Sequence, residues 1–501
     1  MHPSNDQTSR QNDSWLCLLF IIVLSFFTYA YNFGNPAALF WDENYHISSA
    51  QKYLNGVSFM EPHPPLGKLL IALGEKIVHP NALTNQFINT DYAQNPPAGF
   101  SFVGFRLFPT LLAWWTAPLL FVIFLLLTRR HLWAMLLSFL YVFDNALIVH
   151  QRAAMLESTM LFFGSLTILA FLWLLEWNDD PKLFRRASIL FGAAFGCLLA
   201  TKAFGLIFIL VIPFLAYKLR HHLKQFCIFL GYGFSAFLVL YCGIWYIHFA
   251  LGTTVNPSLP DKGYYQASPE YKTILDQHRT RSLSAFPVML RDSLAFVTHY
   301  EKGVPRLDMC KKDENGSPWF YWPFGARSIS YRWESLEGGN AYRYMYLQVN
   351  PVIWLTAFIG LLLAAFLLLA QYLLPSNPKL KNPFLLTVFF TLYVCFLIAV
   401  SRIDRVMYLY HYFLPLFFTF FLFALVLNEL EVIGRFHLTD RRKTIALLSL
   451  GIAIFLSYQF YRPFTYYEPL TDKQFAKRNI VRLWDLKCVR CDLNDPLVVP
   501  K

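Results

Sequence analysis

Long apolar runs recur along the chain and alternate with short polar segments. About 20 consecutive apolar residues are enough to cross a bilayer as a helix. By this measure roughly eleven runs qualify, although 187–200 and 203–217 are short and are separated only by Thr201-Lys202. The pattern therefore predicts an all-α polytopic membrane protein. The predicted spans lie near 15–31, 107–127, 131–149, 154–175, 187–200, 203–217, 226–250, 350–373, 383–400, 406–428 and 443–460.

The composition supports the membrane interpretation. The 501 residues are 56% hydrophobic and 15% charged, whereas soluble domains carry about 25% charged residues. The abundance of Phe (50) and Tyr (28) is typical of lipid-facing and interfacial surfaces. The net charge of +12 does not indicate a nucleic-acid partner, because the basic residues lie in short loops between apolar runs. We therefore expect the lipid bilayer as a partner and no nucleic acid.

The basic loops predict how the helices are oriented. Cytoplasmic loops of membrane proteins carry an excess of Lys and Arg. With a cytoplasmic N-terminus, the basic loops all fall on the cytoplasmic side, provided that 187–217 forms two spans. The first apolar run is long and is preceded by a single Arg, which favours an uncleaved first helix over a signal peptide. The basic loops are 128–131, 178–188, 217–225, 375–382 and 434–443.

This topology divides the chain into four predicted parts. Residues 1–250 form an N-terminal transmembrane catalytic module, which includes the first outer loop, 32–106. Residues 251–349 form an extracytoplasmic cap, 350–460 a module of four spans, and 461–501 an outer tail. The polar clusters of interest thus fall on the extracytoplasmic side.

Two short motifs lie in the outer segments. Cys488 and Cys491 form a C-x-x-C pair in the tail, for which a disulfide is favoured over a zinc half-site or a redox pair on that side of the membrane. Asn315-Gly316-Ser317 matches an N-glycosylation acceptor, which carries no meaning if the protein is bacterial.

Two adjacent carboxylates, Asp42 and Glu43, begin the polar part of the first outer loop, in LFWDENYHISSAQKYLNG (39–56). Repulsion and partial desolvation would raise the pKa of one of them, which suits a general base that takes a proton from a hydroxyl. The alternative is that the acids favour the N-terminus of a helix over 44–54. Asp42 with His46 offers only two metal ligands, too few for a site.

The stretch MEPHPPLGK follows in the same loop. Two successive prolines predict the start of a helix, so His63 and Lys68 are expected to flank its first turn. Residues 64–78 have apolar positions at helical spacing and are expected to lie along the membrane interface. An ordinary loop-to-helix junction explains the same residues.

Cations stand at several outer ends of the predicted spans. Snorkelling explains any one of them, but all of them on the side of the acid pair indicate a pocket for an anion such as a lipid phosphate. The cations are Arg106, Arg152, Lys202, Arg402 and Arg405.

Three further residues on this side are candidates. Asp144 and Glu157 lie at membrane edges, where acids are often functional, although Glu157 is equally expected to pair with a neighbouring cation. His411 lies inside a predicted span, where a packed, hydrogen-bonded histidine is the more common case.

The ordered set of motifs resembles the protein O-mannosyltransferase family over residues 40–430. The first outer loop, FWDENYHISSAQKYLNGVSFMEPHPPLGKLLIALGE, carries the Asp-Glu pair and the His-Pro-Pro-Leu sequence of that family. The later segments FRLFPTLLAWWTAPL, FDNALIVHQRAAMLESTMLFF, GCLLATKAFGLIF, YLQVNPVIWL and MYLYHYFLP resemble family segments in the same order.

The resemblance implies a GT-C glycosyltransferase fold with eleven spans, whose outer-face loops form the active site. It implies transfer of mannose from a polyprenyl-phosphate carrier to Ser or Thr hydroxyls of proteins, by one inverting displacement and without a metal or other cofactor. Asp42 then matches the catalytic acid, Glu43 its partner and Arg106 the functional arginine of the second span. His63, Arg152, Lys202 and His411 match further motif positions.

The chain also departs from the family pattern. Eukaryotic members insert a β-trefoil (MIR) domain in the long central outer loop, for which 251–349 is too short, so a bacterial-type enzyme of the inner membrane is expected. Gln151-Arg152 and Leu156-Glu157 stand where Ser-Arg and Leu-Asp are usual. The acceptor and the sugar therefore stay open. A GT-C enzyme that modifies a lipid or glycolipid, such as an aminoarabinose transferase, is the alternative, and a lipid transporter is less favoured because no repeat is found.

Overall fold

The computed structural model describes residues 5–256, 259–311, 314–336, 341–374 and 379–489. The chain folds into two compact units, and each is assembled from separated stretches of sequence. The first-loop unit comprises Asn32–Leu119 and Gln151–Pro305. The C-terminal unit comprises Met1–Tyr31, Leu120–His150 and Arg306–Lys501.

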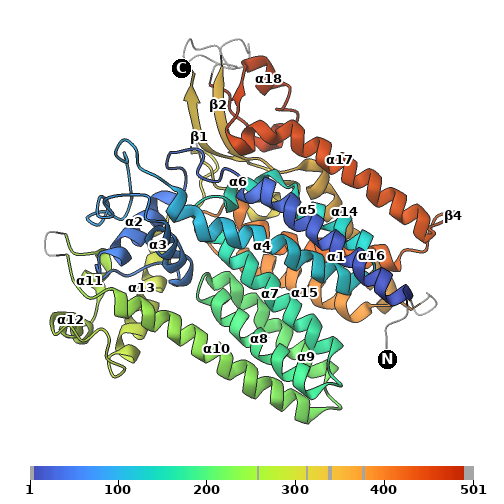
Figure 1. The fold of residues 1–501 in the computed structure, drawn as a ribbon, viewed down its shortest axis with the longest axis horizontal. Helices are drawn as coiled ribbons and strands as arrows, with labels where there is room; N and C mark the ends of the chain where they lie inside the picture. The colour runs from blue at the N-terminus through green and yellow to red at the C-terminus, as the bar shows by residue number, and fades with distance from the viewer. Residues whose placement is uncertain (1–4, 257–258, 312–313, 337–340, 375–378, 490–501) are drawn as a thin grey trace. The chain divides into compact units, whose positions relative to one another are not determined.

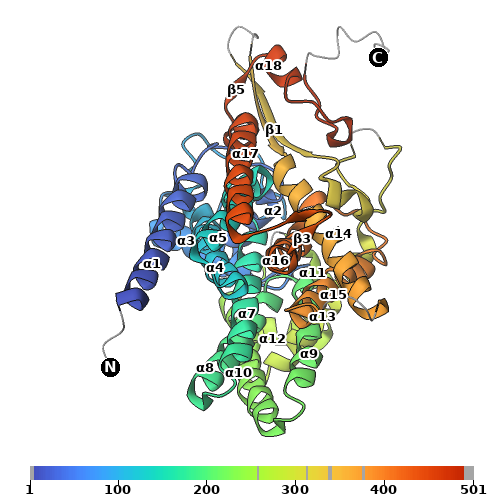
Figure 2. The ribbon, with the colours of Figure 1, turned by 90° about the vertical axis from the view of Figure 1, so that its right-hand side faces the viewer.

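The first-loop unit is almost entirely helical (Figure 1). The helices α7, α8 and α10 pack side by side, as both ribbon views show (Figures 1 and 2). The elements of this unit are α2 (Glu43–Leu54), α3 (Leu66–Val78), the first part of α4 (Val103–Thr128), α7 (Glu157–Glu176), α8 (Pro181–Leu199), η2 (Ala203–Leu210), α9 (Val211–Lys218), α10 (Leu223–Leu251), α11 (Lys262–Gln266), α12 (Pro269–Asp276) and α13 (Phe286–Gly303).

The C-terminal unit combines helices with a small sheet. Its three-stranded antiparallel sheet has the order β1-β2-β5, with Ile329 opposite Leu347 and Tyr342 opposite Leu470. Its elements are α1 (Asn5–Ser25), η1 (Phe26–Ala30), the last part of α4, α5 (His131–Val142), α6 (Asn145–Gln151), η3 (Trp319–Phe324), β1 (Ile329–Ser335), β2 (Tyr342–Leu347), α14 (Pro351–Leu373), α15 (Pro383–Val400), η4 (Leu409–Tyr412), α16 (Phe413–Glu429), β3 (Val432–Ile433), β4 (Phe436–His437), α17 (Asp440–Tyr466), β5 (Pro469–Leu470), α18 (Asp472–Ala476) and η5 (Arg482–Trp484).

The described helices confirm a multi-pass membrane protein. Eight are long and apolar enough to cross a bilayer, and α5 with α6, bent by 63°, makes up to nine. The short runs predicted at 187–200 and 203–217 fall in α8, whose N-terminal part carries three basic residues, and in the short apolar helix Ala203–Lys218. The count of eleven spans therefore stays a prediction.

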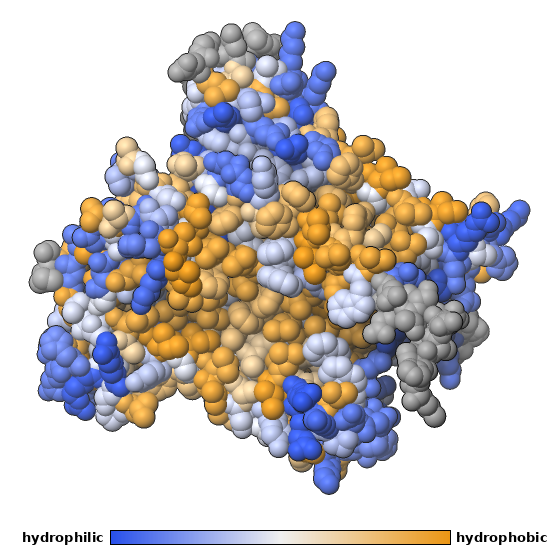
Figure 3. All heavy atoms as spheres, in the orientation of Figure 1, coloured by the Kyte–Doolittle hydropathy of each residue, from blue (hydrophilic) through white to orange (hydrophobic). Residues whose placement is uncertain are grey.

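The surface of α10 is consistent with contact with lipid. This helix exposes Phe234, Leu238 and Val239 along its length, and Figure 3 shows hydrophobic side chains over it. Such a row of exposed apolar side chains is unfavourable in water and favourable in a bilayer.

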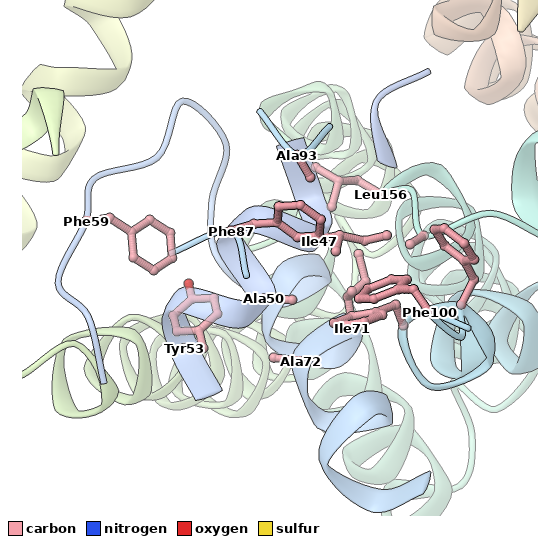
Figure 4. Packing of buried hydrophobic residues seen from close by; sticks show 13 residues of the cluster. Ile47, Ala50, Tyr53, Phe59, Ile71, Ala72, Phe87, Ala93, Phe100 and Leu156 are labelled. Atoms are coloured by element: carbon pink, nitrogen blue, oxygen red, sulfur yellow. The ribbon is translucent and has the colours of Figure 1, made fainter. Parts of the chain in front are cut away.

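A hydrophobic cluster within residues 32–106 joins α2 to α3. Ile47 and Ala50 of α2 pack with Ile71 and Ala72 of α3, and Leu156 lies in the same cluster (Figure 4). At Gly74, α3 approaches the backbone of α4 so closely that a Cβ atom would collide with the carbonyl oxygen of Gly104. The packing of these helices fixes the loop that carries the candidate acids.

Residues 251–349 and the tail were expected to form separate parts of the chain. Residues 251–349, expected as one cap, contribute α11 to α13 to the first-loop unit and η3, β1 and β2 to the C-terminal unit. In the tail, Cys488 is disulfide-bonded, whereas Cys491 lies outside the described residues. The division into four consecutive parts stays a prediction.

Candidate active site

The acid pair stands at the start of α2, where the two side chains have different surroundings. Asp42 is the residue before the helix and is half-buried, and Glu43 is the first helical residue and is fully buried. The backbone oxygen of Asp42 accepts hydrogen bonds from the amides of Tyr45 and His46, but its carboxylate does not cap the helix. The helix expected over 44–54 is thus present, and the two adjacent carboxylates are directed to different surroundings.

Glu43 is held by Arg106 of α4 in a two-point ion pair. The Nε and Nη2 atoms of Arg106 lie 2.7 and 2.8 Å from the two carboxylate oxygens of Glu43, and both side chains are buried. The amide of Ala154 donates a third hydrogen bond, of 2.8 Å, to Glu43. Charge-assisted, bidentate pairs of this kind fix geometry strongly.

The remaining donors of Arg106 bind the chain that leads into the loop. Nη1 donates to the carbonyl oxygens of Gly34 and Pro36 at 2.9 and 2.7 Å, and Nη2 donates to that of Ala38 at 2.9 Å. A guanidinium has five N–H groups, and all five are therefore occupied. A contact between Arg106 and a donor phosphate, as the sequence predicts, would require one of these bonds to break.

A second ion pair links the end of the HPPLGK segment to α2. Lys68, in the first turn of α3, pairs with Glu61, and Glu61 also accepts a hydrogen bond from Ser49 of α2. The pKa of Lys68 is lowered from 10.5 to about 7, chiefly by burial and also by the charge of Lys52, while Asp42 opposes the shift. The helix starts at Leu66, directly after the two prolines as predicted, and His63 is half-buried in the loop before it.

Residues next to the start of α7 and the end of α8 contribute further charged groups. Lys202 forms a buried ion pair with Glu157, the first residue of α7, so the expectation that Glu157 pairs with a cation is met. Arg152 donates from Nη2 to the carbonyl oxygen of Asn32 at 2.8 Å. The backbone amide of Leu66 donates to the carbonyl oxygen of Ala200 at 2.9 Å, which brings the start of α3 next to Lys202.

Three predicted site residues belong to the C-terminal unit. Asp144 accepts hydrogen bonds from the amide of Leu147 and the indole of Trp354, both at 2.9 Å. His411 is buried, bonds to the backbone of Tyr408 and stacks on Trp322. Arg402 is exposed beyond the end of α15. Asp144 and His411 thus have structural contacts of their own.

From the sequence, His46 was considered only as a possible metal ligand together with Asp42. It is buried on α2, and charges on Lys68, His63, Glu157 and Lys202 all act on it. Its position four residues after Asp42 places it on the same face of the helix, which is the signal that marks it in the sequence. Over the described ranges there is no group of three or more His, Cys, Asp and Glu side chains that could hold a metal ion.

Comparison with known families identifies the class of protein. The family model "Dolichyl-phosphate-mannose-protein mannosyltransferase" matches residues 19–256, and the model "C-terminal four TMM region of protein-O-mannosyltransferase" matches residues 295–484. The chain belongs to the protein O-mannosyltransferase family. The resemblance of the ordered motifs is thereby confirmed.

Curated members of the protein O-mannosyltransferase family match over part of the chain. Dolichyl-phosphate-mannose–protein mannosyltransferase 4 of Schizosaccharomyces pombe is 30% identical over 206 residues, which are 40% of this chain and 26% of the relative. Protein O-mannosyl-transferase 1 of Rattus norvegicus is 32% identical over 160 residues, 31% of this chain and 21% of the relative. The matched segment therefore spans about a quarter or less of these relatives.

The fold is shared with a solved member of the family. The S. cerevisiae protein O-mannosyltransferase Pmt1–Pmt2 complex bound to the sugar donor superposes with a TM-score of 0.77 at 14% identity, over 95% of this chain and 93% of the yeast chain. The predicted GT-C fold is confirmed by this similarity.

Proposed function

We propose that the chain transfers mannose from a polyprenyl-phosphate carrier to Ser or Thr hydroxyls of proteins. Membership of the family supports the reaction class. The observation that carries the proposal is the arrangement at the start of α2, where the half-buried Asp42 follows a loop that Arg106 and Glu43 hold in place. A carboxylate held at an accessible helix start is suited to act as a general base.

In the proposed reaction Asp42 accepts the proton of the acceptor hydroxyl. The hydroxyl oxygen forms a bond to the anomeric carbon of mannose, while the bond from that carbon to the phosphate oxygen breaks. The electron pair leaves with the polyprenyl phosphate, and the single displacement inverts the anomeric configuration. Glu43 does not touch the reacting atoms in this scheme, because both of its oxygens bind Arg106, and it positions the helix start.

Negative charge develops on the leaving phosphate, and nearby cations would stabilise it. We assign this role to Arg152, which lies shortly before α7, and to Lys202, which lies shortly after α8, both in the first-loop unit. Arg402 is retained as a candidate from the C-terminal unit. Arg106 is assigned to positioning instead, since its donors are occupied by Glu43 and three backbone carbonyls.

The proposed setting is the extracytoplasmic face of a bacterial plasma membrane. Support for the side comes from the basic loops of the sequence, which favour the cytoplasm. Support for the source comes from residues 251–349, whose described part consists of helices and the strands β1 and β2 rather than a β-trefoil. The carrier lipid is a substrate in this proposal, and the reaction needs no further cofactor.

A direct assay distinguishes the proposed acceptor from the lipid alternative. Purified full-length protein in nanodiscs receives polyprenyl-phosphate [³H]mannose with either a Ser/Thr-rich peptide or lipid A, and label in each acceptor is counted. We expect label in the peptide, which is lost when its Ser and Thr are replaced by Ala. Label in lipid A alone would contradict a protein acceptor, and label in neither would contradict mannosyl transfer.

A further inference from the structure

A cavity lies at the end of α2 that is away from Asp42. It is formed by the last turns of α2, the loop 88–91 and the segment that leads into α11, all within the first-loop unit. Its volume is about 110 Å³, whereas one water molecule needs only about 10–15 Å³. The cavity therefore has room for a small side chain, and none of the residues assigned to the proposed reaction lines it.

Lys52 holds the wall of the cavity together through two ion pairs. Its Nζ atom lies 2.6 Å from Asp91 and 3.2 Å from Asp261, and the side chains of Lys52 and Asp261 are buried. Asp261 also accepts hydrogen bonds from the amides of Met60 and Gly263, at 3.2 and 2.8 Å. The cavity is thus preformed between segments that lie 209 positions apart in the sequence.

The charges that line the cavity are balanced. Lys262 lies 4.0 Å from the second carboxylate oxygen of Asp91, so two lysines stand beside two aspartates. A charged group that entered the cavity would have to compete with these pairs for its own counter-charge. The lining therefore favours an uncharged ligand.

The rest of the lining combines apolar and polar groups, as is usual for ligand sites. Apolar contact comes from Val57, Ile88, Leu259 and Pro260. Hydroxyl and amide groups, which both donate and accept hydrogen bonds, come from Asn89, Thr90 and Asn256. A peptide segment with an uncharged side chain matches this chemistry, because it offers an apolar group together with main-chain donors and acceptors.

One face of α2 leads from the cavity to Asp42. Tyr45 follows Asp42 by three residues and precedes Lys52 by seven, so the three residues share a face of the helix. The ring of Tyr45 packs edge-on against that of Tyr92, with centroids 4.8 Å apart, and the two side chains are 44% and 38% exposed. Tyr92 directly follows Asp91 of the cavity wall. An exposed aromatic pair therefore lies between the proposed base and the cavity.

The length of this face suits an extended acceptor peptide. Asp42 and Lys52 are separated by about 15 Å along the axis of α2, at about 1.5 Å per residue. An extended chain advances about 3.3 Å per residue. A peptide whose hydroxyl lies at Asp42 would therefore reach the cavity with a residue about four or five positions away.

We propose that the cavity at the end of α2 and the Tyr45–Tyr92 pair form a subsite for the acceptor peptide. An uncharged side chain about four or five residues from the target Ser or Thr occupies the cavity, and the intervening chain crosses the two tyrosine rings. The proposal rests on the proposed mannosyl transfer to proteins, and it adds the part of the protein that holds the acceptor beyond its reacting hydroxyl.

The first test varies the length of the acceptor. Full-length protein in nanodiscs receives polyprenyl-phosphate mannose and peptides with a single Ser, extended by uncharged residues on its N-terminal or its C-terminal side. We expect kcat/KM to rise about tenfold, mainly through a lower KM, when the extension reaches about four or five residues on one of the two sides. Asp or Lys at that position should abolish the rise.

The second test fills the cavity. Leu259 is 56% exposed and lines the cavity, so Leu259→Trp is expected to occupy it from the segment before α11, and Asn89→Trp from the opposite loop. In both variants the ratio of kcat/KM between long and short peptides should fall from about ten to about one. Leu283→Trp, at a 78% exposed position of the same unit outside the lining, is the matched control and should keep the wild-type ratio.

The outcomes separate the subsite from the reaction. Mannosyl transfer whose kcat/KM does not depend on peptide length overturns the subsite and leaves the proposed function intact, as does a full length effect in Leu259→Trp and Asn89→Trp. If neither substituted protein folds, an equal rise with Asp or Lys at the critical position overturns the subsite instead. Wild-type protein that labels no peptide of any length overturns the proposed function itself.

Discussion

Asp144 and Asp42 each stand just before a helix, and their surroundings differ. Both carboxylate oxygens of Asp144, before α6, accept hydrogen bonds from local structure: one from the amide of Leu147 and the other from the indole of Trp354. Asp42, before α2, forms no such cap and is half-buried rather than fully buried. Asp144 therefore stabilises the local structure, whereas Asp42 is a candidate base. The two aspartates differ in the hydrogen bonds that their side chains make.

The largest effect is expected for Asp42→Asn. The amide cannot accept the acceptor proton, so transfer should fall by a factor of about 10³ or more, the upper range for general-base loss. The variant removes no helix cap, because the side chain of Asp42 does not cap α2, and thermal unfolding measures whether the fold is kept. Asp276→Asn, at an exposed position of the same unit, is the matched control. Asp42→Asn protein with full activity would remove Asp42 from the chemistry.

Arg106→Lys is expected to be the next largest change, and it acts on stability. A lysine cannot reproduce the two-point pair with Glu43 and the three carbonyl bonds, and breaking a buried pair costs about 3–5 kcal/mol. Chemical denaturation of the purified variant measures the loss. Affinity of the remaining folded protein for polyprenyl phosphate should be unchanged. Weaker phosphate binding at full stability would return Arg106 to the phosphate site.

Asp144→Ala should lower stability less, by about 2–4 kcal/mol, because it leaves the Leu147 amide and the Trp354 indole buried without partners. Asp144→Asn keeps one acceptor oxygen, so its loss of stability should be about half of that in Asp144→Ala. Activity per folded molecule should stay near wild type in both. A catalytic loss as large as that of Asp42→Asn would contradict the contrast between the two acids.

Lys68 should produce the smallest effect, in the pH dependence of stability. Its folded pKa of about 7 lies below the usual 10.5, so between these values the unfolded state binds more protons. Stability should then rise with pH from about 7 upward, by about 1.4 kcal/mol per pH unit at most. Lys68→Met should remove this slope in pH-dependent denaturation. An identical slope in the variant would contradict the low pKa.

Some of the site follows from the sequence because its signals are local. The start of α3 after Pro64-Pro65 and the helix after Asp42 were predicted from residues that lie next to each other. The hydrogen bonds of Arg106 could not be predicted in this way, because the residues that accept them lie 63 to 72 positions away in the sequence. The pairing of Lys202 with Glu157 spans 45 positions and could only be stated as one option among several.

The sequence by itself determined the class of the protein: a helical membrane protein with acids and cations gathered on one side. It could do so because apolar length, loop charge and motif order are properties of the linear chain. Only the tertiary structure decided which charged side chains form ion pairs with one another. The bidentate pair of Glu43 and Arg106 and the pair of Lys202 and Glu157 join side chains that lie 63 and 45 positions apart in the sequence and meet in a buried place. There, hydrogen-bond geometry and desolvation decide what each group can still bind.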